Sequence, residues 1–200
     1  MKAVHTLALA AALFAGAVSA EAETPCLRSD DALVKNLVTR GLHGSETFRQ
    51  LYQRLEDSNL IVHLRRSTRA RQGTAYNQFI TYAGSYRFVR ITLNVDEPDN
   101  MAVALLGHEL RHAVELAEAP AVDDSDDYQR LYDRIGYESC SRAAPRCYET
   151  EAAVRAGRDV LHELRKKPIG VGAAIGAAQL LARWLAQAGG GWSADNGDAP

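Results

Sequence analysis

The spacing of apolar residues predicts two helices near the start of the chain. Apolar side chains recur every three or four residues from Ala32 onward, and Gly41 is expected to end this first helix. A second helix is expected to begin at Ser45 and to stop at Asp57. Its apolar face consists of Phe48, Leu51, Tyr52 and Leu55. Residues 21–28 show no such period and are expected to form a loose segment.

The period then changes from helical to alternating. Residues 60–64, 75–82 and 86–95 are predicted strands, and in the last of them Val89 and Ile91 begin a regular alternation that predicts one buried face. The short connections favour an antiparallel meander. Arginines are frequent in this region, namely Arg65, Arg66, Arg69, Arg71, Arg87 and Arg90. We interpret them as a solvated outer sheet face and not as a polyanion-binding patch, because the chain as a whole is acidic.

Helical spacing returns in the second half of the chain. Helices are predicted over residues 98–118, 128–135 and 148–166. The acidic run 123–127 lacks the glycine and the distant glutamate of a helix-loop-helix calcium site, so we interpret it as a solvated linker that caps the next helix. These elements predict an α+β fold in which a small antiparallel β-sheet packs against a central helix and further helices.

The two ends of the chain differ from its middle. Residues 1–20 combine a positive start, an apolar run and small residues before a cleavage point, which is typical of a secretory signal peptide. We therefore expect a secreted or periplasmic protein whose main domain spans residues 21–168. Residues 169–188 are rich in Gly and Ala but also hold polar residues, which favours a packed C-terminal helix over a stable membrane span. Residues 189–200 are expected to be disordered.

Composition narrows the possible partners only slightly. The chain has 200 residues, of which 46% are hydrophobic and 24% charged, enough for one domain with a real core. Its net charge of -2 gives no basic excess that would indicate nucleic acid. Nothing in the composition indicates an oligomeric state.

Export would permit disulfides, and the chain has three cysteines. Cys140 and Cys147 bracket a loop-like stretch and could close a small ring, while pairing of Cys26 with either of them is the rival arrangement. A cysteine-rich zinc site is not expected, because the sequence contains no Cys-x-x-Cys pair.

The strongest chemical signal is the His-Glu-x-x-His stretch formed by His108, Glu109 and His112. Residues four apart lie one turn apart on a helix, so both imidazoles can reach one metal ion. In this pattern the glutamate acts as general base on the metal-bound water. Apolar neighbours indicate that the helix is packed, and two histidines beside carboxylates would be costly there without a ligand. We therefore expect zinc.

A zinc site of this kind needs a third protein ligand. Glu115 lies three residues after His112 on the same helix face, but it is also placed to orient a histidine from behind. Glu149 belongs to the predicted helix 148–166, where small residues would allow close approach to the motif helix. We favour Glu149 as the ligand, since three ligands from one straight helix would crowd the metal, and keep Glu115 as the alternative.

These features together resemble the gluzincin branch of zinc metallopeptidases. The resemblance implies a zincin-like fold over residues 60–160, with His108 and His112 as zinc ligands, Glu109 as general base and Glu149 as third ligand. It also implies that the strand 86–95 lines the cleft and pairs with an extended peptide. The chain is similar as well to small exported bacterial proteins of unassigned function that carry this helix.

Two functions of different class follow. The first is an exported zinc metalloendopeptidase acting on a peptide or protein, and the second is a non-catalytic, zinc-stabilised module that binds peptides or a cell-envelope partner. Glu109 favours the first, because a structural zinc needs no base. The oxyanion-stabilising residue is not identified, and the candidates are Tyr128, Tyr132, Tyr137 and Tyr148. A non-haem iron site formed with Glu115 is a third, weaker hypothesis.

Overall fold

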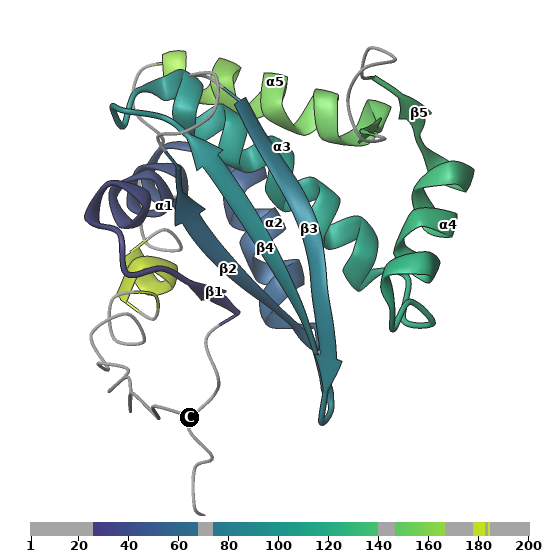
Figure 1. Ribbon diagram of the computed structural model, residues 1–200. Helices are drawn as coiled ribbons and strands as arrows, with labels where there is room; N and C mark the ends of the chain where they lie inside the picture. The colour runs from purple at the N-terminus through teal and green to yellow at the C-terminus, as the bar shows by residue number, and fades with distance from the viewer. Residues whose placement is uncertain (1–25, 68–73, 140–146, 167–177, 183, 185–200) are drawn as a thin grey trace, which may run out of the picture.

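The protein has a mixed α+β fold in which helices cover one face of a small sheet (Figure 1). The computed structural model describes residues 26–67, 74–139, 147–166, 178–182 and 184. The helices are α1 (Ala32–Gly44), α2 (Glu46–Glu56), α3 (Asn100–Ala117), α4 (Ser125–Ile135) and α5 (Glu151–Arg165). The strands are β1 (Leu27–Arg28), β2 (Leu60–Arg66), β3 (Thr74–Ala83), β4 (Tyr86–Asn94), β5 (Tyr137–Glu138) and β6 (Tyr148–Glu149).

The main sheet has the strand order β1-β2-β4-β3. Strands β1, β2 and β4 are parallel, and β3 runs antiparallel to β4 at the edge. The predicted antiparallel meander is therefore wrong: the hairpin of β3 and β4 is present, but β2 pairs with the far side of β4. A seven-residue connection easily spans two strand spacings of about 4.8 Å each, so a short loop did not require β2 and β3 to be adjacent.

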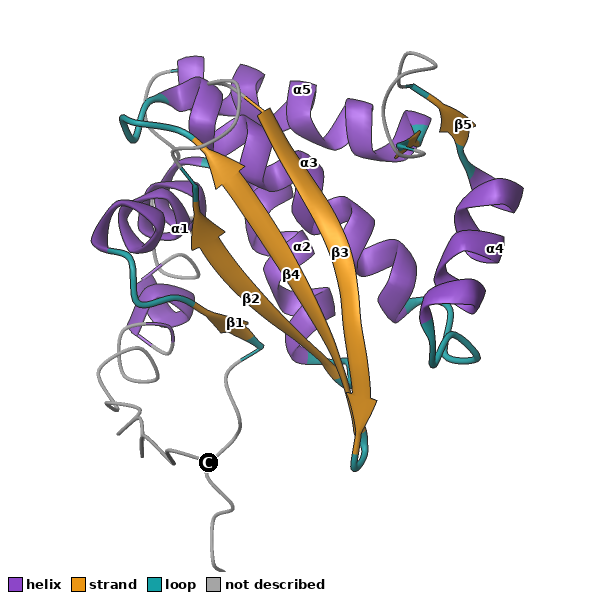
Figure 2. Cartoon of the chain, in the orientation of Figure 1, coloured by secondary structure: helices purple, strands orange, loops and turns teal. Residues whose placement is uncertain are grey.

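Helices α1, α2 and α3 lie behind the sheet in Figure 2, α5 runs across α3, and α4 stands to one side. The core forms where inward-facing strand residues such as Val62, Val89 and Ile91 meet the apolar stripes of these helices. The buried face predicted for residues 86–95 is thus confirmed, although Thr92 and Asn94 on the other face are buried as well. Residues 178–182 and 184 are helical as well, and Leu180 and Trp184 are buried in the core. Within the described ranges no helix is long and apolar enough to cross a membrane.

Several local predictions need correction. Gly41 does not end α1, which continues to Gly44, and the ring of Phe48 occupies the space beside Gly41 that a side chain would need. The segment before residue 29 is not entirely loose, because β1 pairs in parallel with β2. Both predictions rest on short stretches of sequence. Contacts with other parts of the chain decide whether the helix continues and whether the strand forms.

The arginines of the sheet do not behave as one solvated set. Arg87 is only 2% exposed, and its guanidinium donates hydrogen bonds of 2.8 Å to the carbonyl oxygens of Leu116 and Ala119. It therefore adds a positively charged donor at the C-terminal end of α3, to carbonyl groups that also accept hydrogen bonds from the backbone N–H groups of Ala119 and Val122. Arg66 forms a 2.9 Å ion pair with Asp31, the N-cap of α1.

Candidate metal centre

Helix α3 presents both motif histidines on one side. The Asp99 carboxylate caps the helix by accepting a 2.7 Å hydrogen bond from the backbone N–H of Ala102. The buried residues of α3 include Val103, Leu106 and Leu110, and their packing fixes the orientation of the helix. His112 is 5% exposed, and the side chain of His108 is 18% exposed, so the pair lies at the boundary between core and solvent.

Glu149 approaches the two histidines from a different element. Its carboxylate oxygens lie 3.2 Å from Nε2 of His108 and 3.3 Å from Nε2 of His112. One potential ligand atom from each of the three residues lies within 4.8 Å of the others. Nitrogen and oxygen donors of this kind and number suit zinc with one position left open.

The position of Glu149 in the chain corrects one step of the sequence reasoning. We expected it on the small-residue face of a helix over 148–166, but it belongs to the short strand β6. The helix begins later because Thr150 is the N-cap of α5, with its hydroxyl accepting a hydrogen bond from the backbone N–H of Ala153. Glu149 pairs with Tyr137 of β5, so a two-stranded ladder holds its backbone.

Glu115 contacts the opposite side of the His112 ring. Its Oε2 lies 2.9 Å from Nδ1 of His112, and its Oε1 accepts a 2.7 Å hydrogen bond from the Thr150 hydroxyl. Glu115 is thus not among the three residues whose donor atoms converge, and it fixes the ring orientation from behind. The backbone N–H of Thr150 also donates to Glu149 at 2.8 Å, which links both carboxylates to the start of α5.

The electrostatics of the cluster favour positive charge between its members. Burial alone would lower the pKa of His112, but the carboxylates of Glu115 and Glu149 raise it to about 9. Burial conversely raises the pKa of Glu149, yet hydrogen bonds from His108 and His112 lower it to about 2. A cation among these groups is strongly favoured, whether it is a proton or a metal ion.

Glu109 lies beside the cluster and is 4% exposed. Burial raises the pKa of its carboxyl group, against the opposing effect of the two histidines. A buried carboxylate with a raised pKa accepts a proton more readily than an exposed one. The backbone carbonyl of Glu109 accepts a 3.2 Å hydrogen bond from the Asn77 amide, which ties β3 to this point of α3.

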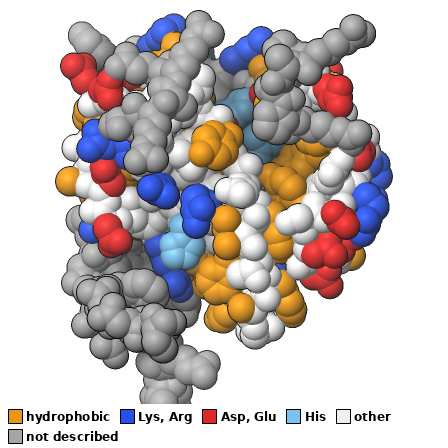
Figure 3. Space-filling model, in the orientation of Figure 1, with side chains coloured by type: hydrophobic (Ala, Val, Ile, Leu, Met, Phe, Trp, Pro, Cys, Tyr) orange, Lys and Arg blue, Asp and Glu red, His pale blue; other side chains and the backbone are white. Residues whose placement is uncertain are grey.

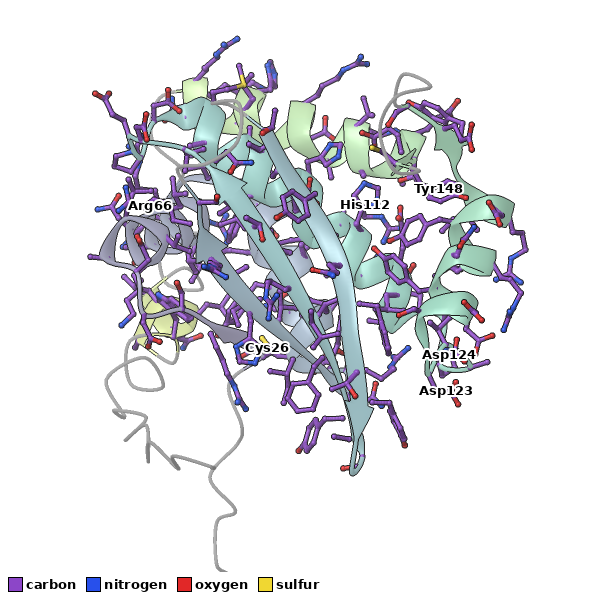
Figure 4. All side chains as sticks on the ribbon, viewed as in Figure 1. Cys26, Arg66, His112, Asp123, Asp124 and Tyr148 are labelled. Carbon is purple, nitrogen blue, oxygen red and sulfur yellow. The ribbon has the colours of Figure 1, made fainter. Side chains whose placement is uncertain are left out.

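The four candidate tyrosines fall in different places. The Tyr132 hydroxyl donates to the backbone carbonyl of His112 at 2.9 Å, and the Tyr148 hydroxyl donates to Asp133. Tyr128 is packed against Tyr132, and burial raises its pKa. Tyr137 is 50% exposed. Figure 4 shows Tyr148 close to His112, on the side of the site where α4 lies.

Small residues let α3 and α5 approach closely, as the sequence predicted. A Cβ atom added at Gly107 would lie 2.8 Å from Cγ2 of Val160, and one added at Gly157 would lie 3.2 Å from Cβ of His108. Gly157 therefore leaves room for the first metal-ligand candidate. Thr150 and Asn77 are the site residues that sequence reasoning missed. A helix-capping threonine is a recognisable signal, but its bond to a residue 35 positions away is not.

The strand that borders the site is β3. Strand β4, which we expected to line the cleft, is paired on both sides and offers no free backbone edge. Strand β3 is paired only with β4 among the described strands, and it contacts α3 and α4. Phe79 of β3 packs near Tyr128 of α4, with ring centroids 6.2 Å apart.

Other predicted features are separate from this centre. Cys147 is disulfide-bonded and Cys26 is a buried thiol, which excludes their mutual pairing; Cys140, the expected partner of Cys147, lies outside the described residues. Asp123 and Asp124 lie apart from His112 in Figure 4. Asp124 caps α4 by accepting from the backbone N–H of Asp127, as expected of a capping linker.

Comparison of the chain with known protein families, with curated proteins and with solved structures found no match.

Proposed function

We propose that this chain is an exported zinc-dependent metallopeptidase of the gluzincin type. The observation that carries the proposal is the convergence of His108, His112 and Glu149 beside the buried carboxylate of Glu109. Two imidazoles and one carboxylate are the ligand set of zinc hydrolases, and a buried base next to them has no purpose in a purely structural site. The signal-like N-terminal sequence supports export.

Each residue has a distinct role in this proposal. Zinc held by His108, His112 and Glu149 would polarise a peptide carbonyl and make a water acidic. Glu109 would take a proton from that water at its carboxylate and return it to the leaving amine. The raised pKa of Glu109 suits this exchange, because the group must hold the proton between the two steps. Glu115 would keep the His112 ring in the orientation that presents Nε2.

The substrate of such an enzyme would be an extended peptide chain. Strand β3 borders the site. The hydrogen bond from the Asn77 side chain to the backbone carbonyl of Glu109 fixes the position of β3 along α3. Backbone groups at its outer edge are suited to pairing with a peptide. We therefore propose that β3, and not the strand 86–95 expected from the sequence, lines the cleft and pairs with the peptide.

Metal content and turnover test this proposal together. Elemental analysis of the mature chain should give about one zinc per molecule, and Glu149→Ala should lose it. Glu109→Gln should retain zinc but reduce cleavage of a peptide library by a factor of roughly 10² or more, since general-base catalysis contributes about 10²–10⁴. Absence of zinc, or cleavage that survives Glu109→Gln, would refute it.

The alternative is a zinc-stabilised module that binds without cleaving. The observation that favours it is that the hydroxyl groups of Tyr132 and Tyr148 already donate to protein acceptors. Neither is then available to stabilise an oxyanion without rearranging. Zinc without measurable turnover, together with peptide binding that Glu109→Gln leaves unchanged, would favour this alternative.

A further inference from the structure

Thr150 lies where three elements of the candidate metal centre meet. It directly follows Glu149, the last residue of β6, and it is the N-cap of α5. Its side chain also reaches Glu115 on α3, 35 positions earlier in the chain. Thr150 is only 4% exposed, so its hydrogen bonds lie away from water and their loss would leave buried polar groups unpaired.

The single hydroxyl proton of Thr150 has a fixed destination. The hydroxyl oxygen accepts a 3.1 Å hydrogen bond from the backbone N–H of Ala153, which caps α5. A hydroxyl that accepts in this way still has one proton to donate. Thr150 donates it to Oε1 of Glu115 at 2.7 Å. The same side chain therefore caps a helix and holds a buried carboxylate.

The bond from Thr150 decides which cationic group Glu115 faces. Oε2 of Glu115 lies 2.9 Å from Nδ1 of His112, whereas Oε1 lies 3.7 Å from Nε of Arg111. The guanidinium of Arg111 is always charged, so a Glu115 released by Thr150 would have a second cation to turn toward. With the Thr150 hydroxyl in place, Oε1 is held and Oε2 stays on the imidazole of His112.

The backbone N–H of Thr150 orients the candidate ligand Glu149. It donates to Oε1 of Glu149 at 2.8 Å, and this oxygen is the one that lies 3.3 Å from Nε2 of His112. Oε2 of Glu149 then faces Nε2 of His108 at 3.2 Å. One residue thus holds a carboxylate that would bind the metal and a carboxylate that orients a metal-binding histidine.

The C-terminal end of α4 keeps Thr150 in this position. A Cβ atom added at Gly136, the C-cap of α4, would lie 2.8 Å from the carbonyl oxygen of Glu149 and 3.6 Å from Cγ2 of Thr150. The backbone of α4 therefore packs directly against these two residues, without an intervening side chain. Contacts from α3, α4 and α5 together fix where the hydroxyl and the N–H of Thr150 point.

We propose that Thr150 is a positioning residue of the metal centre. Its hydroxyl holds Glu115 on His112, and its backbone N–H directs Glu149 toward the metal. This inference rests on the proposed function, because it concerns the metal that His108, His112 and Glu149 would hold. Loss of a group that orients a metal ligand typically lowers metal affinity by a factor of about 10–100. Removal of the hydroxyl alone leaves the backbone N–H in place, so we expect the lower figure, roughly tenfold.

Metal affinity is a suitable readout because the centre is open to exchange. The side chains of His108 and Glu149 are 18% and 20% exposed, and Figure 3 shows histidine side chains at the surface of this face. Titration of the zinc-loaded full chain with a fluorescent chelator at pH 7.4 measures this affinity. Loss of a helix cap away from the centre does not change it, which separates a positioning role from a merely structural one.

Three substitutions of Thr150 and one control test the inference. Thr150→Val keeps the shape without the hydroxyl and should bind zinc about tenfold more weakly, whereas Thr150→Ser should bind zinc as wild type does. Thr150→Asp keeps an acceptor that caps α5, but its carboxylate has no proton to donate and repels Glu115. It should lose at least as much affinity as Thr150→Val, and it decides the question if Thr150→Val does not fold. Asp124→Ala removes the cap of α4 and should leave zinc affinity unchanged.

A double-variant cycle shows whether Thr150 acts through Glu115. Thr150→Val combined with Glu115→Gln should bind zinc about as weakly as Glu115→Gln alone, because the hydroxyl then has no carboxylate to hold. Losses that multiply would overturn the inference, as would a Thr150→Val or Thr150→Asp variant that binds zinc like wild type. Either result would leave the zinc site and the proposed function standing. A wild-type chain that binds no zinc would instead refute the proposed function, and this inference with it.

Discussion

Replacing Glu115 by Gln should weaken zinc binding without abolishing it. Glu115 is 6% exposed and lies between Nδ1 of His112 and the Thr150 hydroxyl, at 2.9 Å and 2.7 Å. Glutamine keeps the shape but removes the charge that holds His112 and increases its basicity toward the metal. Loss of such a partner typically costs a factor of about 10–100 in affinity, which corresponds to about 1.4–2.7 kcal/mol.

Competition with a fluorescent zinc chelator at pH 7.4 measures this effect. Glu118→Gln is the matched control, because Glu118 lies at the end of the same helix but is half exposed and pairs with Arg54 and Arg111. The control should bind zinc as wild type does. An unchanged affinity for Glu115→Gln would refute the orienting role. A loss as complete as that of Glu149→Ala would instead make Glu115 a direct ligand, and would revive the single-helix ligand set.

Three further predictions concern stability. In protein from which a chelator has removed metal, the pKa of His112 is about 9, above its ordinary 6.5. Protonated His112 therefore contributes fully to folding stability below pH 6.5, and this contribution is lost as the pH rises to about 9. The melting temperature should fall across this pH window, and should fall less in His112→Asn. Gly107→Ala should destabilise the fold by about 1–3 kcal/mol in urea unfolding, because the new Cβ would lie 2.8 Å from Val160, and adding Val160→Ala should recover part of this. Arg87→Met should cost about 1.5–3 kcal/mol in the same assay, since it removes the charged donor that hydrogen-bonds to the C-terminal end of α3, and a loss below about 0.5 kcal/mol would contradict this role.

The parts of the site that depend on one helix were predictable from sequence. His108, Glu109 and His112 are fixed relative to each other by helical spacing, and the apolar neighbours of α3 showed which side is packed. The placement of Glu115 behind His112 follows from the same spacing. Both relations are local, so no knowledge of the rest of the fold was needed.

The strand order was not predictable in the same way. Alternation identified β4 and its buried face, but it does not say which strands lie on either side of it. Strand β2 joins β4 in parallel, an arrangement that depends on contacts distant in sequence. This error also affected the strand that was expected to pair with a peptide, since β4 is central and has no free backbone edge.

Glu149 was identified for a partly wrong reason, and the difference is informative about how the centre is held. A helical Glu149 would have been positioned by α5 alone, whereas the observed residue lies where β6 ends and α5 begins. Thr150 connects the two: its hydroxyl caps α5 and donates to Glu115, and its backbone N–H donates to Glu149. The start of α5 and the arrangement of the carboxylates around His112 therefore depend on the same residue. Because these bonds exist among protein groups alone, the centre is largely pre-organised, and a metal ion would bind to carboxylates and imidazoles already held in place.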